Sequence, residues 1–357
     1  MRRSWYLSRG VPSGQADFIA NGVYARPKWI FKYLKRRLFT LLVPRMLGLV
    51  PELNRIADDH SRILWINLSA PSIGDSLMDL SARVLLDGRE VVLLTHPKNK
   101  SLFENDDCYS SVFSDYRELI AKYGRSYFDL VICDSYSPRV LSKKLTVAPF
   151  VPFVGLYGYL NGFEVHRTYF AFARMRELLA LNKFVHPIRP TLSLHERLKK
   201  QTPEMDVCIS VGGEWSFRTY DQWYEVVSWL IEKGYSVSLV GSENGVCDAA
   251  RISENHPSVR STVGCLSLKE VCIEVAKAKV FIGADGGLWH IACAIPVPTV
   301  VLFADCQIFD EEGNRVTRET KDMVCETLYD DFKVANISNS LVIEAFERLW
   351  NRVAFDS

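Results

Sequence analysis

The 357-residue sequence lacks several patterns that mark common classes of protein. Its nine cysteines include no Cys-x-x-Cys pair and no Cys/His cluster, so neither a disulfide framework nor a structural zinc site is indicated. The formal net charge is only +1, which argues against a nucleic-acid-binding protein as a whole. No two aspartates are separated by a single residue, so an Asp-x-Asp metal-chelating motif is absent.

Long uninterrupted apolar runs are also missing. Arg45 breaks one apolar stretch, and Asp285 with His290 breaks another, so no membrane-spanning helix is expected. No secretion signal is recognisable. Together with the scattered cysteines, these features favour a protein of the reducing cytoplasm.

What the sequence does contain is alternation of strand-like and helical segments. Such alternation predicts an α/β protein with parallel sheets covered by helices on both faces, and the chain is long enough for two doubly wound domains. The strand-like runs are residues 63–68, 90–94, 130–133, 206–211, 237–240, 280–282 and 299–303. The pairs His186-Pro187 and Arg189-Pro190 interrupt the helical pattern between residues 182 and 204, where the join is expected.

Four segments follow from this division. Residues 1–60 form a basic, amphipathic N-terminal extension, and residues 61–185 an N-terminal Rossmann-like domain. Residues 186–339 form a C-terminal domain of the same kind. Residues 340–357 contain a last helix.

The most informative segment is the loop from Gly283 to His290. A strand that ends in two glycines and turns directly into a helix directs unpaired backbone N–H groups and a positive dipole end at one point, which suits a phosphate. Asp285 would fix the loop or hold a ribose hydroxyl, Gly286 and Gly287 would form the turn, and His290 would reach a diphosphate oxygen. The alternative is that the glycines serve only the backbone.

The run DGGLWHIACAIPVPTVVLF that contains this loop resembles the nucleotide-binding signature of glycosyltransferase family 9, the lipopolysaccharide heptosyltransferases. Asp285, Gly287 and His290 match the pattern, as do Pro298 and Thr299. The sequence departs from it at Gly286, where the family usually has a hydroxyl, and at Ala304, where the family commonly has Gly. The resemblance implies the GT-B fold, in which two Rossmann-like domains face an interdomain cleft. It also implies that residues 61–185 lie on the acceptor side, that residues 186–339 bind the nucleotide sugar, and that the last helix, in residues 340–357, crosses back to the first domain.

A second matching segment follows the strand-like run 63–68. Ser72, Gly74 and Asp75 match the family's Ser-x-Gly-Asp loop, whose aspartate is taken as the catalytic base. An inverting transfer needs one carboxylate to remove the acceptor hydroxyl proton as this oxygen attacks the anomeric carbon. The alternative is that Asp75 only caps the helix that follows.

A third segment resembles the opening of the family's second domain. Gly213 lies in its small-residue loop, and Arg218 lies near the family's lysine that touches the donor diphosphate. Glu243, just after the strand-like run 237–240, is the candidate for the glutamate that contacts the nucleoside. The alternatives are an ordinary surface arginine and a solvated turn carboxylate.

Acceptor contacts are predicted from local charge. His96, Lys98, Lys100 and Arg167 lie in cationic segments that could meet an anionic core sugar or phosphate, or could belong to solvated loops. The aromatic stretch 150–159 would form either an acceptor lid or a buried connection.

The first fifty residues contain one acid, Asp17, among many cations. Residues 27–50 mix aromatic, aliphatic and cationic side chains, as interfacial helices do, so they would either hold the protein at an anionic inner-leaflet surface or pack on the N-terminal domain.

The sequence therefore predicts an inverting, metal-independent glycosyltransferase without a cofactor. By resemblance, its donor is ADP-heptose and its acceptor is the inner core of a lipid A-linked saccharide. The alternatives are a relative that uses another nucleotide sugar or a protein acceptor, a nucleotide-sugar epimerase, and a non-catalytic nucleotide- or glycan-binding subunit.

Overall fold

The computed structural model describes residues 52–69, 72–104, 106–135, 137–157, 167–181, 189–192, 203–304 and 324–355. The chain divides into two compact units, Met1–Pro190 and Thr191–Ser357. The division lies inside the segment 182–204 that is expected from the prolines.

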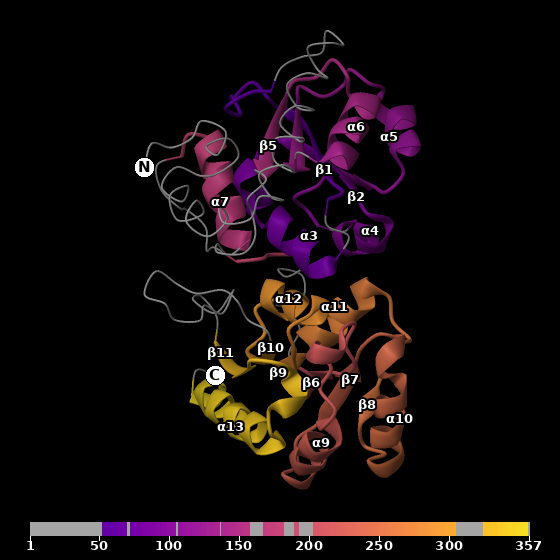
Figure 1. Ribbon diagram of the computed structural model, residues 1–357, viewed down its shortest axis with the longest axis vertical. Helices are drawn as coiled ribbons and strands as arrows, with labels where there is room; N and C mark the ends of the chain where they lie inside the picture. Colours follow the sequence, from indigo (N-terminus) through magenta and orange to yellow (C-terminus); the bar gives the residue numbers. More distant parts are fainter. Residues whose placement is uncertain are drawn as a thin grey trace. The chain divides into compact units, whose positions relative to one another are not determined.

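The first unit contains a five-stranded sheet in the order β3-β2-β1-β4-β5, and every neighbouring pair is parallel (Figure 1). Its strands are β1 (Arg62–Asn67), β2 (Glu90–Thr95), β3 (Ser111–Phe113), β4 (Leu130–Ser135) and β5 (Phe153–Tyr157). The central strands β1 and β4 are almost entirely buried, which explains their continuous apolar sequences.

Helices cover both faces of this sheet. The first unit's helical elements are α3 (Ile73–Leu80), η1 (Ser81–Leu86), α4 (Pro97–Phe103), α5 (Tyr116–Tyr123), α6 (Pro138–Val147) and α7 (Arg167–Leu178). Helices α5 and α6 pack their apolar side chains on the face that carries Leu64, Val92 and Val131. Helix α7 contacts α3, η1 and β5.

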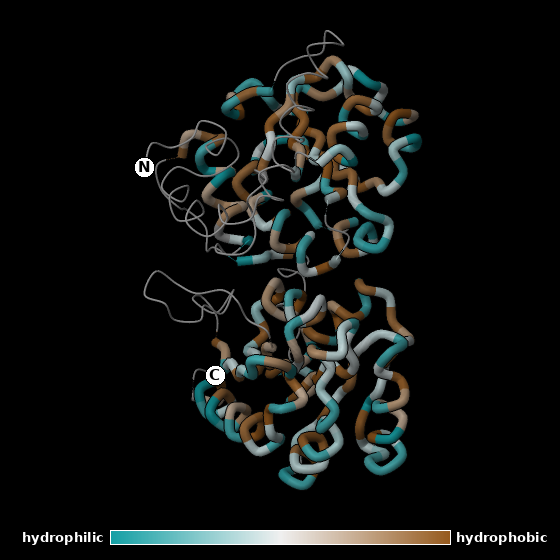
Figure 2. The backbone as a smooth tube through the Cα atoms, viewed as in Figure 1, coloured by the Kyte–Doolittle hydropathy of each residue, from teal (hydrophilic) through white to brown (hydrophobic). Residues whose placement is uncertain are grey.

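The second unit contains a six-stranded parallel sheet in the order β11-β10-β9-β6-β7-β8. Its strands are β6 (Met205–Ser210), β7 (Val237–Val240), β8 (Arg260–Ser261), β9 (Ala278–Ala284), β10 (Thr299–Ala304) and β11 (Cys325–Asp330). Figure 2 shows hydrophobic residues concentrated along the strands of both sheets, and mixed hydropathy along the helices that cover them. The prediction of an α/β protein with two doubly wound parallel sheets is confirmed.

The second unit's helical elements are η2 (Ser216–Arg218), α9 (Trp223–Glu232), η3 (Glu243–Gly245), α10 (Val246–Asn255), α11 (Leu268–Ala276), α12 (Gly287–Ala294), η4 (Val334–Asn336) and α13 (Asn339–Phe355). Helices α9, α10 and α13 share one core with the strands, whereas α11 and α12 pack on β9.

The last helix, α13, packs within the second unit. This segment was expected to cross back to the first domain, but its apolar residues Val342, Ala345, Phe346 and Leu349 are buried in the core of the second unit. Its contacts with β11, β10 and α9 explain why, since this apolar stripe completes one face of the second sheet.

Four strands lie outside the runs expected from the sequence, namely β3, β5, β8 and β11. Strand β5 occupies the middle half of the aromatic stretch 150–159, whose expected role was a lid or a buried connection. It lies at an edge of the first sheet and pairs only with β4 among the named strands.

Each sheet reverses its strand order at one point. In the first sheet, β1 lies between β2 and β4, and the reversal lies between β1 and β4. In the second sheet, β6 lies between β7 and β9, and the reversal lies between β6 and β9. Loops after neighbouring strands leave the sheet in opposite directions at such a point, which opens a crevice where α/β proteins bind ligands.

Candidate active site

The donor-side candidates meet at the reversal point of the second sheet. The loop after β6 contains Gly212, whose φ of +82° favours glycine, and Gly213. A Cβ atom on Gly213 would lie 2.6 Å from Thr219 Oγ1 and 2.9 Å from the carbonyl oxygen of Arg218. This close packing sets the position from which Arg218 extends.

Asn244 connects this loop to the next strand. Its Nδ2 donates a hydrogen bond of 2.6 Å to the carbonyl oxygen of Gly213, and Ser242 Oγ donates to Asn244 Oδ1 over 2.5 Å. Asn244 could not be predicted from the sequence, because a polar turn residue carries no signal of a partner 31 positions earlier. Glu243, the nucleoside candidate, lies beside it in η3 and is exposed to solvent.

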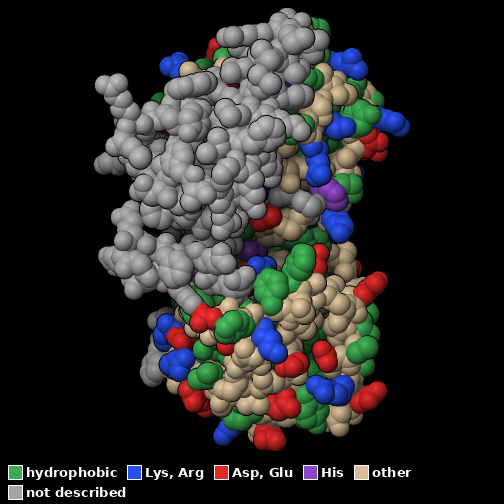
Figure 3. Space-filling view, viewed as in Figure 1, with side chains coloured by type: hydrophobic (Ala, Val, Ile, Leu, Met, Phe, Trp, Pro, Cys, Tyr) green, Lys and Arg blue, Asp and Glu red, His purple; other side chains and the backbone are tan. Residues whose placement is uncertain are grey.

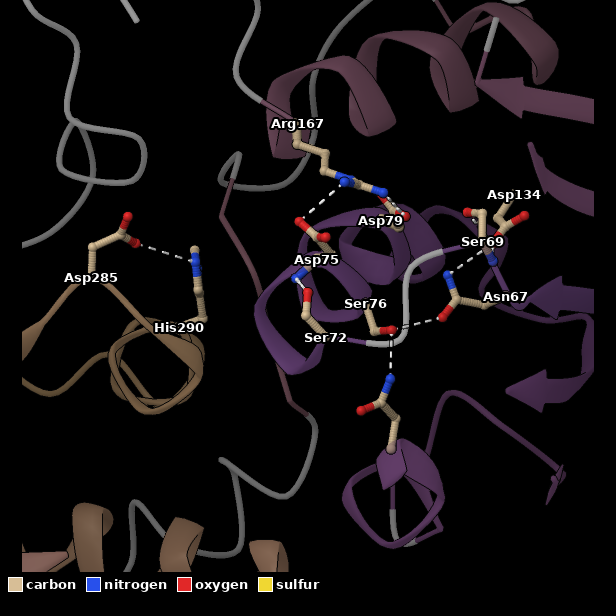
Figure 4. A network of polar contacts seen from close by, with 11 residues as sticks. Asn67, Ser69, Ser72, Asp75, Ser76, Asp79, Asp134, Arg167, Asp285 and His290 are labelled. Carbon is tan, nitrogen blue, oxygen red and sulfur yellow. Dashed lines mark hydrogen bonds and ion pairs between the residues drawn. The ribbon is translucent and has the colours of Figure 1, made fainter. Parts of the chain in front are cut away.

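Asp285 links the loops that follow β6 and β9. Its Oδ2 lies 3.3 Å from Arg218 Nη2, and its Oδ1 lies 3.8 Å from His290 Nε2, the pair drawn at the left of Figure 4. Asp285 and His290 have side chains only 7% and 6% exposed, whereas the side chain of Arg218 is 34% exposed. A buried carboxylate thus holds two nitrogen-bearing side chains at one place.

The guanidinium of Arg218 is only partly engaged. Its Nε atom is buried and has no hydrogen-bond acceptor within the described residues. Its Cζ atom lies 5.2 Å from the centre of the Phe217 ring. A buried N–H without an acceptor is costly, so this atom favours a ligand oxygen.

Helix α12 begins where the phosphate seat is predicted. Gly286 is its N-cap in an extended conformation, without a side-chain cap, and Gly287 is its first residue. A Cβ atom on Gly286 would meet only the carbonyl oxygen of Ala284, at 3.7 Å. The backbone N–H groups of this first turn are therefore not covered by a side chain of the cap residue.

The first unit positions Asp75 at the start of α3, directly after β1. Ser72 is the N-cap of this helix, and its Oγ accepts a hydrogen bond of 3.4 Å from the backbone N–H of Asp75. The carboxylate of Asp75 is therefore not the cap, which was the alternative to catalysis. Its side chain is 39% exposed.

Arg167 lies against Asp75 rather than in an open cationic loop. Its Nη1 atom is 3.0 Å from Asp75 Oδ1, while Nη2 donates a hydrogen bond of 2.6 Å to Asp79 Oδ2 and Nε donates to Asp79 Oδ1 (Figure 4). Asp79 follows Asp75 by one helical turn and is completely buried. Asp79 was not predicted from the sequence, since the family motif ends at Asp75.

A buried polar network supports the same loop at the reversal point of the first sheet. Asp134 Oδ2 at the end of β4 accepts hydrogen bonds from the backbone N–H and the hydroxyl of Ser69, at 2.8 and 2.7 Å. Ser76 Oγ in α3 donates to Asn67 Oδ1 over 2.9 Å and accepts from Asn99 Nδ2 over 2.7 Å. Burial raises the pKa of Asp134 to about 6.

The remaining acceptor candidates lie in helix α4 rather than in a solvated loop. His96 is the N-cap of α4, and its Nδ1 accepts a hydrogen bond of 3.4 Å from the backbone N–H of Lys98. Lys100 forms an ion pair of 3.3 Å with Glu104. Of these three side chains, only that of Lys98 is exposed and has no partner in the described part of the chain.

Residues 27–50, the candidate membrane segment, lie outside the described residues, as do residues 158–166 before Arg167. None of the helices in the described ranges is long and apolar enough to cross a membrane. Within the same ranges, no three His, Cys, Asp or Glu side chains are grouped to hold a metal ion. On the face of the second unit in Figure 3, acidic and basic side chains are interspersed.

One family model matches part of the chain. Residues 163–309 match the family model of glycosyltransferase family 9 (heptosyltransferase), a range that includes Arg167, Arg218 and His290 but not Asp75. No curated protein matches the chain significantly in sequence.

Solved structures share the fold over most of the chain. A family 9 glycosyltransferase from Veillonella parvula has a TM-score of 0.64 at 13% identity, covering 84% of this chain and 100% of that chain. E. coli ADP-heptose lipopolysaccharide heptosyltransferase II has a TM-score of 0.60 at 18% identity, over 82% and 99%. E. coli heptosyltransferase WaaC with ADP has a TM-score of 0.64 at 14% identity, over 82% and 99%.

The chain is therefore a glycosyltransferase with the GT-B fold. Its resemblance is to the heptosyltransferases of glycosyltransferase family 9, as the sequence motifs predict, and this resemblance is confirmed.

Proposed function

We propose that this glycosyltransferase is inverting and metal-independent, and that it transfers heptose from ADP-heptose to the inner core of a lipid A-linked saccharide. The observation that carries the proposal is the group formed by Asp285, Arg218 and His290 at the reversal point of a parallel sheet. Two structural relatives support the donor, because their names include ADP-heptose in one case and bound ADP in the other.

The donor diphosphate would bind the second unit. Arg218 offers an Nε–H without an acceptor in the described residues, and α12 offers uncapped backbone N–H groups. His290 would donate to a phosphate oxygen. These donors would meet the negative charge that develops on the leaving diphosphate, which is the task a metal performs in enzymes with an Asp-x-Asp motif. Gly213 and Glu243 would border the nucleoside.

Asp75 would act as the general base. The acceptor O–H bond breaks as its proton moves to Asp75, the acceptor oxygen forms a bond to the anomeric carbon, and the bond from that carbon to the diphosphate breaks with its electron pair on the leaving oxygen. Asp75 Oδ1 contacts Arg167, whereas Oδ2 has no polar contact among the described residues. Oδ2 is therefore the oxygen that would receive the proton.

The test is Asp75→Asn, assayed with ADP-heptose and a lipid A-linked inner-core saccharide that lacks heptose. We expect kcat to fall by about 10²- to 10⁴-fold, the usual contribution of a general base, with the Kd for ADP unchanged. Asp115→Asn is the matched control, since Asp115 is an exposed aspartate of the same unit that caps α5, and Asn caps equally well. Unchanged turnover in Asp75→Asn would remove the base assignment.

A relative that uses another nucleotide sugar is the second candidate. Gly286 supports it, because this position lacks the hydroxyl that the family usually presents to the donor. Release of ADP together with a heptose-linked product of inverted configuration would identify ADP-heptose as the donor. The same two products would distinguish a transferase from an epimerase or a non-catalytic subunit.

The proposed place of action is the cytoplasmic face of the membrane that carries the lipid-linked acceptor. The basic residues 27–50 support it, since each cation near an anionic surface contributes about 1 kcal/mol to binding. His96, Lys98 and Lys100 remain the candidates for contact with an anionic acceptor.

A further inference from the structure

Helices α3 and α7 are joined by a charged cluster in which only Asp75 takes part directly in the transfer reaction proposed above. The cluster consists of Asp75, Asp79 and Arg167, with one guanidinium between two carboxylates (Figure 4). Asp75 and Asp79 lie at i and i+4 on α3, a spacing at which two like charges destabilise a helix.

The exposures of the three side chains are graded. Asp79 is fully buried, Arg167 is 23% exposed and Asp75 is 39% exposed. A buried carboxylate needs a partner of opposite charge, and its two oxygens take two nitrogens of Arg167 in the planar geometry that Arg allows. Asp79 thereby fixes the plane and position of the guanidinium.

The third nitrogen of that guanidinium reaches the exposed carboxylate. Arg167 Nη1 lies 3.0 Å from Asp75 Oδ1, and Ser72 holds the backbone N–H of Asp75 from the other side. The carboxylate of Asp75 is thus held by one oxygen while the other remains available. A general base works only when its free oxygen is held in line with the proton it receives.

We infer that Asp79 and Arg167 are positioning residues, which act on the reaction only through the carboxylate of Asp75. This inference rests on the proposed function, because it takes Asp75 as the base. It assigns Arg167 a role different from the acceptor contact expected from the sequence, and it gives the buried Asp79 a role in turnover.

The test compares Arg167→Lys, Asp79→Asn and Asp75→Asn with the wild type, using ADP-heptose and the heptose-free acceptor. A lysine keeps the charge but cannot contact both carboxylates in this geometry. We expect kcat to fall by about 10- to 100-fold in Arg167→Lys and in Asp79→Asn, because a base displaced by about 1 Å loses rate on this scale. The acceptor KM and the Kd for ADP should stay within about 2-fold of the wild-type values, because these substitutions remove no contact that binds either substrate.

A double-mutant cycle separates positioning from other roles. If Arg167 acts only through Asp75, the variant Asp75→Asn with Arg167→Lys should be no slower than Asp75→Asn alone. Additive losses would overturn the inference, as would a raised acceptor KM with unchanged kcat, the result expected of an acceptor contact.

Arg174→Lys is the control on the same helix. Arg174 is buried in α7 and donates through Nε to the carbonyl oxygen of Gly155, away from Asp75. It should lower the melting temperature without lowering kcat. If Arg167→Lys does not fold, Asp79→Asn carries the test by the same cycle. If Asp75→Asn is slow but Arg167→Lys is fully active, only this inference is overturned and the proposed function stands. If Asp75→Asn is fully active, or if the wild type shows no turnover, both proposals are overturned.

Discussion

Among the titratable residues described at the candidate site, Asp134 is the one whose pKa the fold changes most clearly. It is fully buried beneath the loop that leads to Asp75, and this burial raises its pKa from 3.8 to about 6. The hydrogen bonds from Ser69 to the carboxylate oppose that rise. Because the folded protein binds this proton more tightly than the unfolded chain does, protonation of Asp134 stabilises the fold.

The expected result is a loss of stability as the pH rises. The contribution of Asp134 should be fully present below about pH 4 and should be lost as the pH rises through about 6, a change of about 3 kcal/mol in the free energy of unfolding. Urea unfolding of the wild type and of Asp134→Asn between pH 4 and pH 7 measures it. If both proteins show the same pH dependence over this range, Asp134 is not the cause.

Asp129 provides a contrast of opposite sign. Hydrogen bonds from Arg62 lower the pKa of Asp129 to about 2, so its contribution is present above about pH 4 and is lost only in stronger acid. The two effects therefore occupy different pH ranges.

Two glycines of the donor loops should respond differently to substitution. Gly286→Ser has room for its side chain and restores the hydroxyl of the family pattern at an N-cap, so stability should change by less than about 0.5 kcal/mol and ADP should bind more tightly. Gly213→Ala would force its Cβ against Thr219 and Arg218, so the Kd for ADP should rise about 10-fold. Calorimetric titration measures both, and tighter binding by Gly213→Ala would contradict this geometry.

Individual site residues were predictable only where a motif or a charge marked them. Asp75, Arg218 and Asp285 belong to motifs and lie at the ends of predicted strands. Asp79 and Asn244 do not, because their importance comes from contacts with Arg167 and Gly213 that are distant in sequence. Such contacts form only when the chain folds, so the sequence around each residue gives no sign of them.

At the scale of elements, helix α11 provides a test that separates stability from activity. Ser267 Oγ accepts a hydrogen bond of 3.4 Å from the backbone N–H of Glu270, and Glu270 Oε2 accepts one of 2.8 Å from the backbone N–H of Ser267, which together form a capping box. Ser267→Ala should cost about 1 kcal/mol and lower the melting temperature by about 2–4 °C.

Turnover of the folded Ser267→Ala protein should be unchanged, because the cap contributes only to helix stability. Thermal unfolding and the transferase assay on the same sample check both statements. A loss of kcat without a loss of stability would assign Ser267 to the reaction instead.

The sequence predicted the central strands better than the edge strands. Strands β1, β2, β4, β6, β9 and β10 each carry three or more consecutive apolar residues because they are largely buried, and these runs are visible in the sequence. Strands β3, β8 and β11 are short or only partly buried, so their side chains form no such run. Strand β5 lies within the aromatic stretch 150–159, next to Pro149 and Pro152, and this composition obscures the strand.

At the scale of the whole molecule, the strand order explains why motifs far apart in the sequence act together. In each unit, the two neighbouring strands at the reversal point carry candidate residues at their carboxyl ends. These strands are β1 and β4 in the first unit, and β6 and β9 in the second. Asp285 follows β9 and contacts Arg218, which follows β6; Asp134 ends β4 and contacts Ser69, which follows β1.

The most direct test of this account is the affinity of the purified protein for nucleotides. Calorimetric titration with ADP, UDP, GDP and CMP, in the presence of a metal chelator, tests the nucleotide and the metal requirement in one experiment. The account predicts that ADP binds most tightly and that His290→Ala weakens its binding about 10-fold or more, the loss of one charge-assisted hydrogen bond. Binding of none of the four nucleotides, or an ADP affinity that His290→Ala leaves unchanged, would contradict it.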